Sequence, residues 1–170
     1  MLDETIITET PPLYSCYSHV GQQTCIPISG NHARRIVHGV LNIQTGAMSL
    51  LITKTWNQTT HQAFLDMIRS QWRGWQIILF EDRGTPHTAA ASRDYAAALN
   101  IQVRFLPPAT PELNAMDQLW RQTKRQSLAD CPTKSIDESA MALCQYIIDL
   151  SPQERLRKAG VFSGHFWLAE

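Results

Sequence analysis

The 170-residue sequence has no excess of either charge and no long apolar run. Fifteen Lys and Arg residues balance fifteen Asp and Glu residues. Composition alone therefore does not indicate a nucleic-acid-binding surface, and any DNA contact must come from local clusters of basic residues. The longest strongly apolar run, residues 76–80, has the length of a strand and is too short to cross a membrane. We expect a soluble protein with no membrane partner.

The sequence also lacks the signatures of a secreted protein. Its four cysteines form no Cys-x-x-Cys pair, and residues 1–10 contain neither the basic nor the apolar part of a signal peptide. These absences indicate a reducing compartment, and we expect a cytoplasmic location. Because 170 residues with 44% hydrophobic content can bury one substantial core, we expect a single domain over residues 1–170.

The first half of the chain has the patterns of strands and then of a helix. Residues 34–53 contain two apolar, β-branched runs separated by turn residues at 44–46, which predicts a hairpin. Apolar residues at helical spacing predict a helix over about residues 59–72, with Thr59 or Thr60 as its N-cap.

The second half alternates strands with helices. The apolar run WQIILFED is typical of a strand covered on both faces. The expected elements are this strand at 75–82, an alanine-rich helix at 88–99, a strand at 101–106, a helix from about Pro111 or Leu113 to Leu128, and a C-terminal helical segment at about 135–160. Together with a first strand near Asp3, this order predicts an α/β fold, a mixed sheet flanked by helices.

Three acidic residues follow or begin these elements at positions that can converge. Asp3 lies near the first strand, Asp82 ends the strand at 75–82, and Asp117 lies on the following helix. In open α/β sheets, functional groups gather where strands end, so these side chains can meet. Carboxylates from separate elements supply the oxygen ligands that hard divalent ions require.

Two segments carry a resemblance to a known family. Residues 81–87 read EDRGTPH, and residues 104–124 read RFLPPATPELNAMDQLWRQTK. These motifs resemble the catalytic core of mariner-like transposases and their bacterial insertion-sequence relatives. The thirty-four residues between Asp82 and Asp117 also match the spacing of the mariner branch.

The resemblance implies a DDE/D catalytic domain with an RNase H-like fold. It implies that Asp3, Asp82 and Asp117 are the catalytic residues and the ligands of two Mg²⁺ or Mn²⁺ ions. The implied activity is metal-dependent cleavage of DNA strands and strand transfer at transposon ends. The implied partners are double-stranded DNA, as transposon ends and target, and further copies of the chain, in a homodimer or larger assembly in the bacterial cytoplasm.

Further residues are expected close to the site. The family often has an Asp-Glu pair at the end of the first strand, which corresponds here to Asp3 and Glu4. His87 and Asn114 belong to the matching motifs. Arg83 stands where the family usually has Asn, and we expect its positive charge to weaken metal binding.

Basic residues on the helix of Asp117 are candidates for DNA contact. Arg121, Lys124 and Arg125 form a basic edge at helical spacing, and we expect them to contact phosphates. Only two residues precede Asp3, so we expect the first strand to be incomplete and an upstream DNA-binding segment to be missing. Two alternatives remain open. One is a truncated, non-catalytic transposase remnant that inhibits or regulates the full-length enzyme, and the other is a nuclease of the same fold used by the host.

Overall fold

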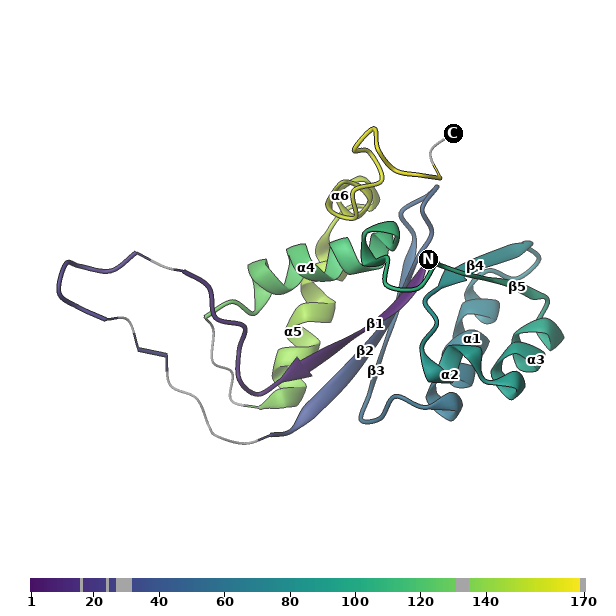
Figure 1. Cartoon of the computed structure of the whole chain (residues 1–170), viewed down its shortest axis with the longest axis horizontal. Coiled ribbons are helices and arrows are strands. Elements are labelled where there is room, and N and C mark those ends of the chain that lie inside the picture. Colours follow the sequence, from purple (N-terminus) through teal and green to yellow (C-terminus); the bar gives the residue numbers. More distant parts are fainter. Residues whose placement is uncertain (16, 24, 27–31, 131–134, 169–170) are drawn as a thin grey trace.

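The computed structural model describes residues 1–15, 17–23, 25–26, 32–130 and 135–168, and Figure 1 shows the arrangement of their elements. In these residues, an antiparallel sheet has the order β1 (Leu2–Thr8), β2 (Arg34–Leu41), β3 (Met48–Thr53), and a parallel pair joins β4 (Ile77–Glu81) to β5 (Ile101–Phe105). The helices are α1 (Gln58–Gln71), α2 (Thr85–Thr88), α3 (Ala90–Ala98), the 3₁₀ turn η1 (Pro111–Leu113), α4 (Ala115–Ser127), α5 (Ile136–Asp149) and α6 (Pro152–Lys158).

The predicted hairpin is confirmed. Strands β2 and β3 pair antiparallel, and Asn42 closes their turn by accepting hydrogen bonds from the backbone N–H groups of Gln44 and Thr45. Gly46 then adopts a φ of 73°, which glycine reaches without steric cost. The turn holds β2 in register with β1 as well as β3.

Four local predictions need correction. The N-cap of α1 is Asn57, whose side chain accepts from the backbone of Thr60, so Thr60 is the third helical residue and not the cap. The alanine-rich helix corresponds to α3 and begins at Ala90 instead of residue 88, and the short helix α2, which was not predicted, precedes it. Strand β4 is not fully covered on both faces, because Ile78 is exposed, although Phe80 on the same face is partly buried. Asp3 is the second residue of the seven-residue strand β1 and does not end it.

Two apolar clusters lie on opposite faces of the antiparallel sheet. Figure 1 shows α4 and α5 on one side, and α1 to α3 grouped with β4 and β5 on the other. Side chains alternate between the two faces along a strand, so Val37 and Leu41 of β2 join the α4/α5 cluster and Val40 joins the α1/α3 cluster. Neighbouring residues of β1 must therefore also face different layers.

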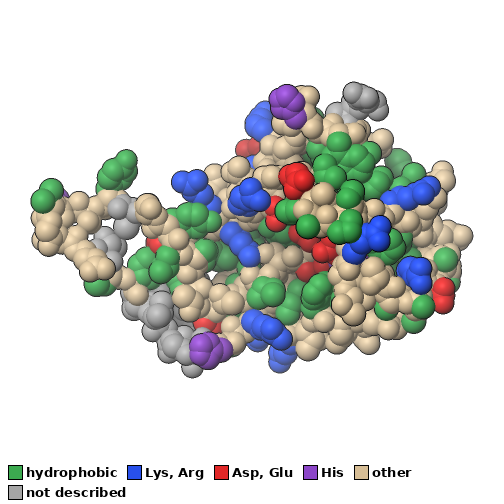
Figure 2. Space-filling view, viewed as in Figure 1, with side chains coloured by type: hydrophobic (Ala, Val, Ile, Leu, Met, Phe, Trp, Pro, Cys, Tyr) green, Lys and Arg blue, Asp and Glu red, His purple; other side chains and the backbone are tan. Residues whose placement is uncertain are grey.

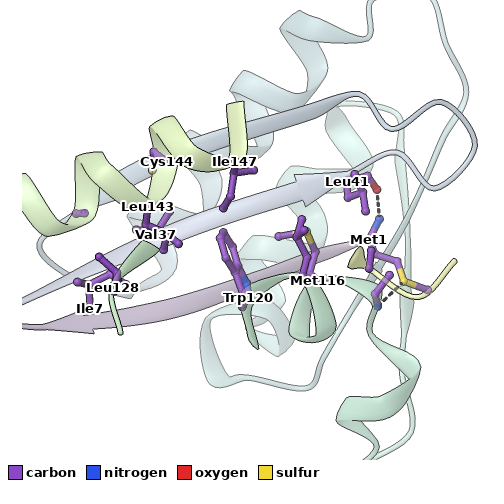
Figure 3. Close-up of a cluster of buried hydrophobic side chains, with 14 of the residues drawn as sticks. Met1, Ile7, Val37, Leu41, Met116, Trp120, Leu128, Leu143, Cys144 and Ile147 are labelled. Carbon is purple, nitrogen blue, oxygen red and sulfur yellow. Dashed lines mark hydrogen bonds between the residues drawn. The ribbon is translucent and has the colours of Figure 1, made fainter. Parts of the chain in front are cut away.

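Helix α4 packs very closely against the sheet. A Cβ atom at Gly39 of β2 would lie 2.5 Å from Cε of Met116 and 2.6 Å from Cζ2 of Trp120, so only glycine fits there. Figure 3 shows Met116 and Trp120 of α4 directed into the cluster that also contains Val37 and Leu41. Because Gly39 pairs with Asp3 across β1 and β2, this close approach brings the start of α4 over Asp3.

Two further observations concern the outer parts of the molecule. In the described part of the chain, none of the helices is both long and apolar enough to cross a membrane. The predicted C-terminal helical segment consists of α5 and α6, capped by Ser135 and Ser151. On α5, Ile147 is buried, whereas its neighbour Ile148 is exposed.

Candidate active site

The adjacent acids of β1 face different layers of the molecule. Asp3 pairs with Gly39, over which α4 packs, whereas Glu4 pairs with His38, whose buried ring contacts Phe64 of α1. The strand periodicity of two therefore sends one carboxylate toward α4 and the next toward α1. The Asp-Glu pair provides two groups with different surroundings.

Asp3 is the point where the three predicted acids converge. Burial, followed by the negative charges of Glu4, Asp82 and Asp117, raises the pKa of Asp3 to about 8. Hydrogen bonds join the elements that carry these acids: His87 joins Asp82 to Glu4, and Asn114 joins the start of α4 to Leu2. The fold thus brings Asp3, Asp82 and Asp117 into one acidic group from three separate elements. Figure 2 shows acidic side chains near the middle of one face, with Lys and Arg on both sides.

Asp82 is held in place by the turn that follows β4. Its Oδ1 accepts hydrogen bonds from the backbone N–H of Gly84 at 2.9 Å and from Nδ1 of His87 at 2.7 Å. The bond from His87, together with that from Gly84, outweighs burial and lowers the pKa of Asp82. With a side chain 53% exposed, Asp82 remains an accessible carboxylate.

His87 joins Asp82 to Glu4. Its ring is buried, Nδ1 contacts Asp82, and Nε2 lies 3.1 Å from Oε1 of Glu4. Burial alone would lower the pKa of His87, but the hydrogen bonds to Asp82 and Glu4 raise it to about 11, so the ring is an imidazolium that donates to both carboxylates. Two carboxylates from distant parts of the sequence are thereby fixed by one ring.

Glu4 is the centre of a buried network behind the acids. Besides the contact with His87, its Oε1 lies 3.1 Å from Nδ1 of His38, whose Nε2 contacts the hydroxyl of Thr53 at 3.0 Å. Burial opposes ionisation, yet the hydrogen bonds from His38 and His87 hold the pKa of Glu4 at about 2. This network ties β1, β2, β3 and the turn after β4 together.

Three members of this network were not identified from the sequence: His38, His61 and Glu81. Candidate ligand atoms of Glu4, His61 and His87 lie within 4.8 Å of one another. His61 lies with its Nε2 3.7 Å from Oε2 of Glu81, and burial raises the pKa of Glu81 to about 7 and lowers that of His61 to about 4. Of the three, only His38 is a polar residue within an apolar run, and that signal does not reveal its partner.

Asp117 and Asn114 belong to the start of α4. Asn114 caps the helix by accepting from the backbone N–H of Met116, and its Nδ2 donates to the carbonyl of Leu2 at 3.1 Å. Asp117 is in the first turn, with its side chain 34% exposed and its Oδ2 2.9 Å from Arg121. The predicted neighbour Asn114 thus connects α4 to the strand of Asp3.

The predicted basic residues have contacts within the chain. Arg121 pairs with Asp117, Lys124 donates from Nζ to the carbonyl of Ile6 at 2.9 Å, and Arg125 lies over the ring of Tyr14. Burial lowers the pKa of Lys124, while the charges of Asp3 and Asp117 act in the opposite direction.

Arg83 turns toward the end of β5. Its Nε donates to the carbonyl of Leu106 at 3.3 Å, and its side chain is exposed. The groups that hold the Asp82 carboxylate are instead His87 and Gly84. The prediction that Arg83 weakens metal binding stays a prediction.

The donor set fits a hard divalent cation. All three acids offer carboxylate oxygens, the ligands that Mg²⁺ and Mn²⁺ prefer. The raised pKa of Asp3 reflects burial and repulsion among like charges, which a bound cation would relieve. Asp82 and Asp117 are partly exposed, so their carboxylate oxygens are accessible to a ligand.

Comparison with known proteins gives a family and a fold. Residues 1–139 match the family model described as DDE superfamily endonuclease. The chain is similar to a Mos1 transposase paired-end complex with left transposon end, with a TM-score of 0.74, 19% identity, and coverage of 97% of this chain and 52% of that one. No match to a curated protein was found.

Two similar structures contain a divalent metal. For the Mos1 mariner paired-end complex with Mn, the TM-score is 0.71 at 20% identity, covering 93% of this chain and 50% of that one. For the Mos1 transposase catalytic domain with raltegravir and Mg, it is 0.60 at 20% identity, covering 74% and 68%. These likenesses confirm the predicted α/β, RNase H-like fold. The chain spans about half the length of the two paired-end-complex transposases.

Proposed function

The chain belongs to the DDE superfamily of endonucleases, and we propose that it is the catalytic domain of a cut-and-paste DNA transposase of the mariner type. The observation that carries the proposal is that hydrogen bonds join the elements of these three acids: His87 joins Asp82 to Glu4, the neighbour of Asp3, and Asn114 joins the start of α4 to Leu2. These contacts support the assignment of Asp3, Asp82 and Asp117, which come from three separate elements, as one catalytic triad. This arrangement favours an enzyme over a non-catalytic remnant.

In this proposal Asp3, Asp82 and Asp117 hold two Mg²⁺ or Mn²⁺ ions. The solved relatives with Mn and with Mg support the use of these metals. When bound, such ions supply an activated hydroxyl for attack on a phosphate and charge stabilisation for the leaving oxygen. The carboxylates of the chain provide the ligand oxygens and, through their placement, the orientation of the reacting phosphate.

Other residues of the chain keep those oxygens in position. The His87 imidazolium and the backbone N–H of Gly84 fix the Asp82 carboxylate, and Glu4 anchors His87 from behind. Asn114 fixes the start of α4, and with it Asp117, against β1. Small displacements of catalytic groups reduce rates strongly, so these positioning contacts matter for activity.

The substrate is double-stranded DNA, and the reaction has two stages. Hydrolysis first cuts a phosphodiester at the transposon end and releases a 3′-hydroxyl, and this hydroxyl then attacks a phosphate of the target DNA, with the target strand's 3′-oxygen as leaving group. The solved relatives in complex with transposon ends support DNA as the partner. We expect the chain to work as a homodimer or larger assembly, on DNA in a bacterial cytoplasm.

Basic side chains beside the acids would contact the DNA backbone. Arg121, Lys124 and Arg125 lie along α4, and phosphate oxygens can replace their present partners on binding. Contacts of this kind follow the phosphate backbone and carry little sequence information. We expect them to position DNA across the acids and to weaken as salt concentration rises.

The test is nicking of supercoiled plasmid with Mg²⁺ or Mn²⁺. Wild-type protein should nick DNA, and Asp82→Ala and Asp117→Ala should each abolish nicking while remaining folded. Thermal melting of Asp117→Ala should be unchanged or slightly raised, because one repelling charge is removed, whereas Asp82→Ala should melt at a lower temperature because the buried His87 ring loses its carboxylate partner. Asp94→Ala, which removes an exposed acid of α3, is the matched control and should nick like the wild type. Nicking by either triad variant at the wild-type rate, in preparations free of other nucleases, would overturn the assignment.

A further inference from the structure

A tryptophan lies at the edge of the acidic group. Trp56 belongs to the connection between β3 and α1, and 41% of its surface is exposed. Its ring meets the buried His87 ring edge-on, with centroids 5.8 Å apart and planes at 71°. The indole therefore rests on the same ring that holds the Asp82 carboxylate.

Gly84 brings the indole and the carboxylate together. A Cβ atom at Gly84 would lie 2.7 Å from Cζ2 of Trp56 and 3.1 Å from Oδ1 of Asp82. Any side chain at this position would displace the indole, the carboxylate or both. Because Gly84 has no side chain, the indole of Trp56 can lie close to Asp82, a proposed metal ligand.

The backbone on both sides of Trp56 is fixed. The hydroxyl of Thr53 donates to the carbonyl of Thr55 at 2.8 Å, and Asn57 forms a reciprocal capping box with Thr60 at the start of α1. Asn57 also donates from Nδ2 to the hydroxyl of Thr55. The indole is consequently preorganised, and a ligand that uses it incurs little entropy cost for ordering it.

We propose that Trp56 is a stacking platform for one unpaired base of the DNA strand whose phosphate is bound at Asp82. The proposal rests on the proposed function, since it needs DNA at the acids. A phosphate at Asp82 places the adjoining nucleotide beside the indole. A base that has left the duplex stack has a free face, whereas a paired base is covered by its neighbours. Stacking of a base on an aromatic side chain contributes about 1–3 kcal/mol and tolerates every base type.

The experiment compares two DNA duplexes of equal length. One is fully paired, and the other has a single unpaired 2-aminopurine, a fluorescent base whose emission reports stacking. Binding and fluorescence are measured for wild type, Trp56→Ala, Trp56→Phe and the control Trp75→Ala. Trp75 is another exposed tryptophan, in the connection between α1 and β4. Thermal melting verifies that each variant is folded, and sedimentation gives its oligomeric state.

Trp56→Ala should lose roughly 5- to 150-fold in affinity for the duplex with the unpaired base, which is 1–3 kcal/mol converted to a ratio. Trp56→Ala should bind the fully paired duplex like the wild type. Its binding should not change the fluorescence of the unpaired 2-aminopurine in the other duplex. Trp56→Phe should restore most of the affinity, and Trp75→Ala should behave as wild type.

Four results would overturn the inference. If Trp56→Ala binds each duplex as tightly as the wild type does, Trp56 is not a stacking platform, and the proposed function is unaffected. An equal loss for both duplexes would assign Trp56 to general DNA contact, and a changed oligomeric state would assign it to a protein interface. If the wild type neither binds nor nicks DNA, the proposed function fails together with the platform.

Discussion

Asn114 of α4 donates a hydrogen bond to the carbonyl of Leu2, the residue before Asp3 in β1, over 3.1 Å. The same side chain caps α4, so one residue fixes the helix that carries Asp117 against the strand that carries Asp3. Asn114 is buried, and both of these contacts are therefore shielded from water.

Replacing Asn114 by Ala should lower the free energy of unfolding by about 2–3 kcal/mol, because it removes an N-cap and leaves a buried carbonyl without its donor. Nicking should fall on the order of 100-fold, since α4 is no longer fixed against β1. Urea unfolding and plasmid nicking measure the two effects. The control Ser151→Ala removes the cap of α6 and should cost about 1 kcal/mol without loss of nicking. Normal activity in a destabilised Asn114→Ala protein would limit this residue to a structural role.

The raised pKa of Asp3 predicts that the stability of the metal-free protein depends on pH. The ordinary pKa of the Asp3 carboxyl is 3.8, and burial and its acidic neighbours raise it to about 8 in the folded state. Between about pH 4 and pH 8 the folded protein keeps a proton that the unfolded chain has lost, so Asp3 makes the fold less stable as pH rises through this window.

Asp3→Asn should remove this dependence. The free energy of unfolding of the variant, relative to wild type, should increase from pH 4 to pH 8 in EDTA, with a slope of at most about 1.4 kcal/mol per pH unit. Glu81 changes stability with the same sign, but it is present in both proteins and its effect largely cancels. Adding Mg²⁺ at pH 8 should stabilise wild type more than Asp3→Asn. A relative stability that is flat across this range would mean that the Asp3 carboxyl titrates normally.

We expect the affinity for divalent metal ions to change when the positive charge of Arg83 is removed. Arg83 follows Asp82 directly in the sequence, and the Asp82 carboxylate is exposed. The Arg83 guanidinium donates a hydrogen bond to the carbonyl of Leu106. Arg83→Asn should bind Mg²⁺ or Mn²⁺ a few-fold more tightly, because a positive charge near the ligands disfavours a cation. Calorimetric titration compares it with Arg93→Asn, which removes an equal charge from exposed α3. Equal or weaker binding by Arg83→Asn would show that this charge does not act on the site.

The sequence was sufficient to predict the fold class, whereas the assignment of the three acids to one site stays a prediction. The hairpin, the strands that became β4 and β5 and the helix of Asp117 follow from local periodicity and turn chemistry. The family motifs around Asp82 and Asp117 identified these two residues as candidates for the site. Asp3 was predicted at the end of its strand because the resemblance placed it there, whereas pairing with β2 continues along β1 to Thr8.

The network behind the acids could not be predicted in the same way. His38, His61 and Glu81 belong to β2, α1 and β4, and their side chains meet only after these elements pack. A histidine within an apolar strand indicates a buried polar group but not its partner. The accessible position of Trp56 is similarly a tertiary property, created by Gly84 in a turn far along the chain.

The central claim is that Asp3, Asp82 and Asp117 together bind divalent metal ions. Its most direct test is titration of the protein with Mn²⁺, following free Mn²⁺ by electron paramagnetic resonance at pH 8. Wild type and the Asp94→Ala control should bind two ions with matching isotherms, and Asp3→Asn, Asp82→Ala and Asp117→Ala should each lose at least one site or weaken binding by tenfold or more, about 1.4 kcal/mol. Unchanged Mn²⁺ binding in all three variants would contradict the account, because the acids would then not be the metal ligands.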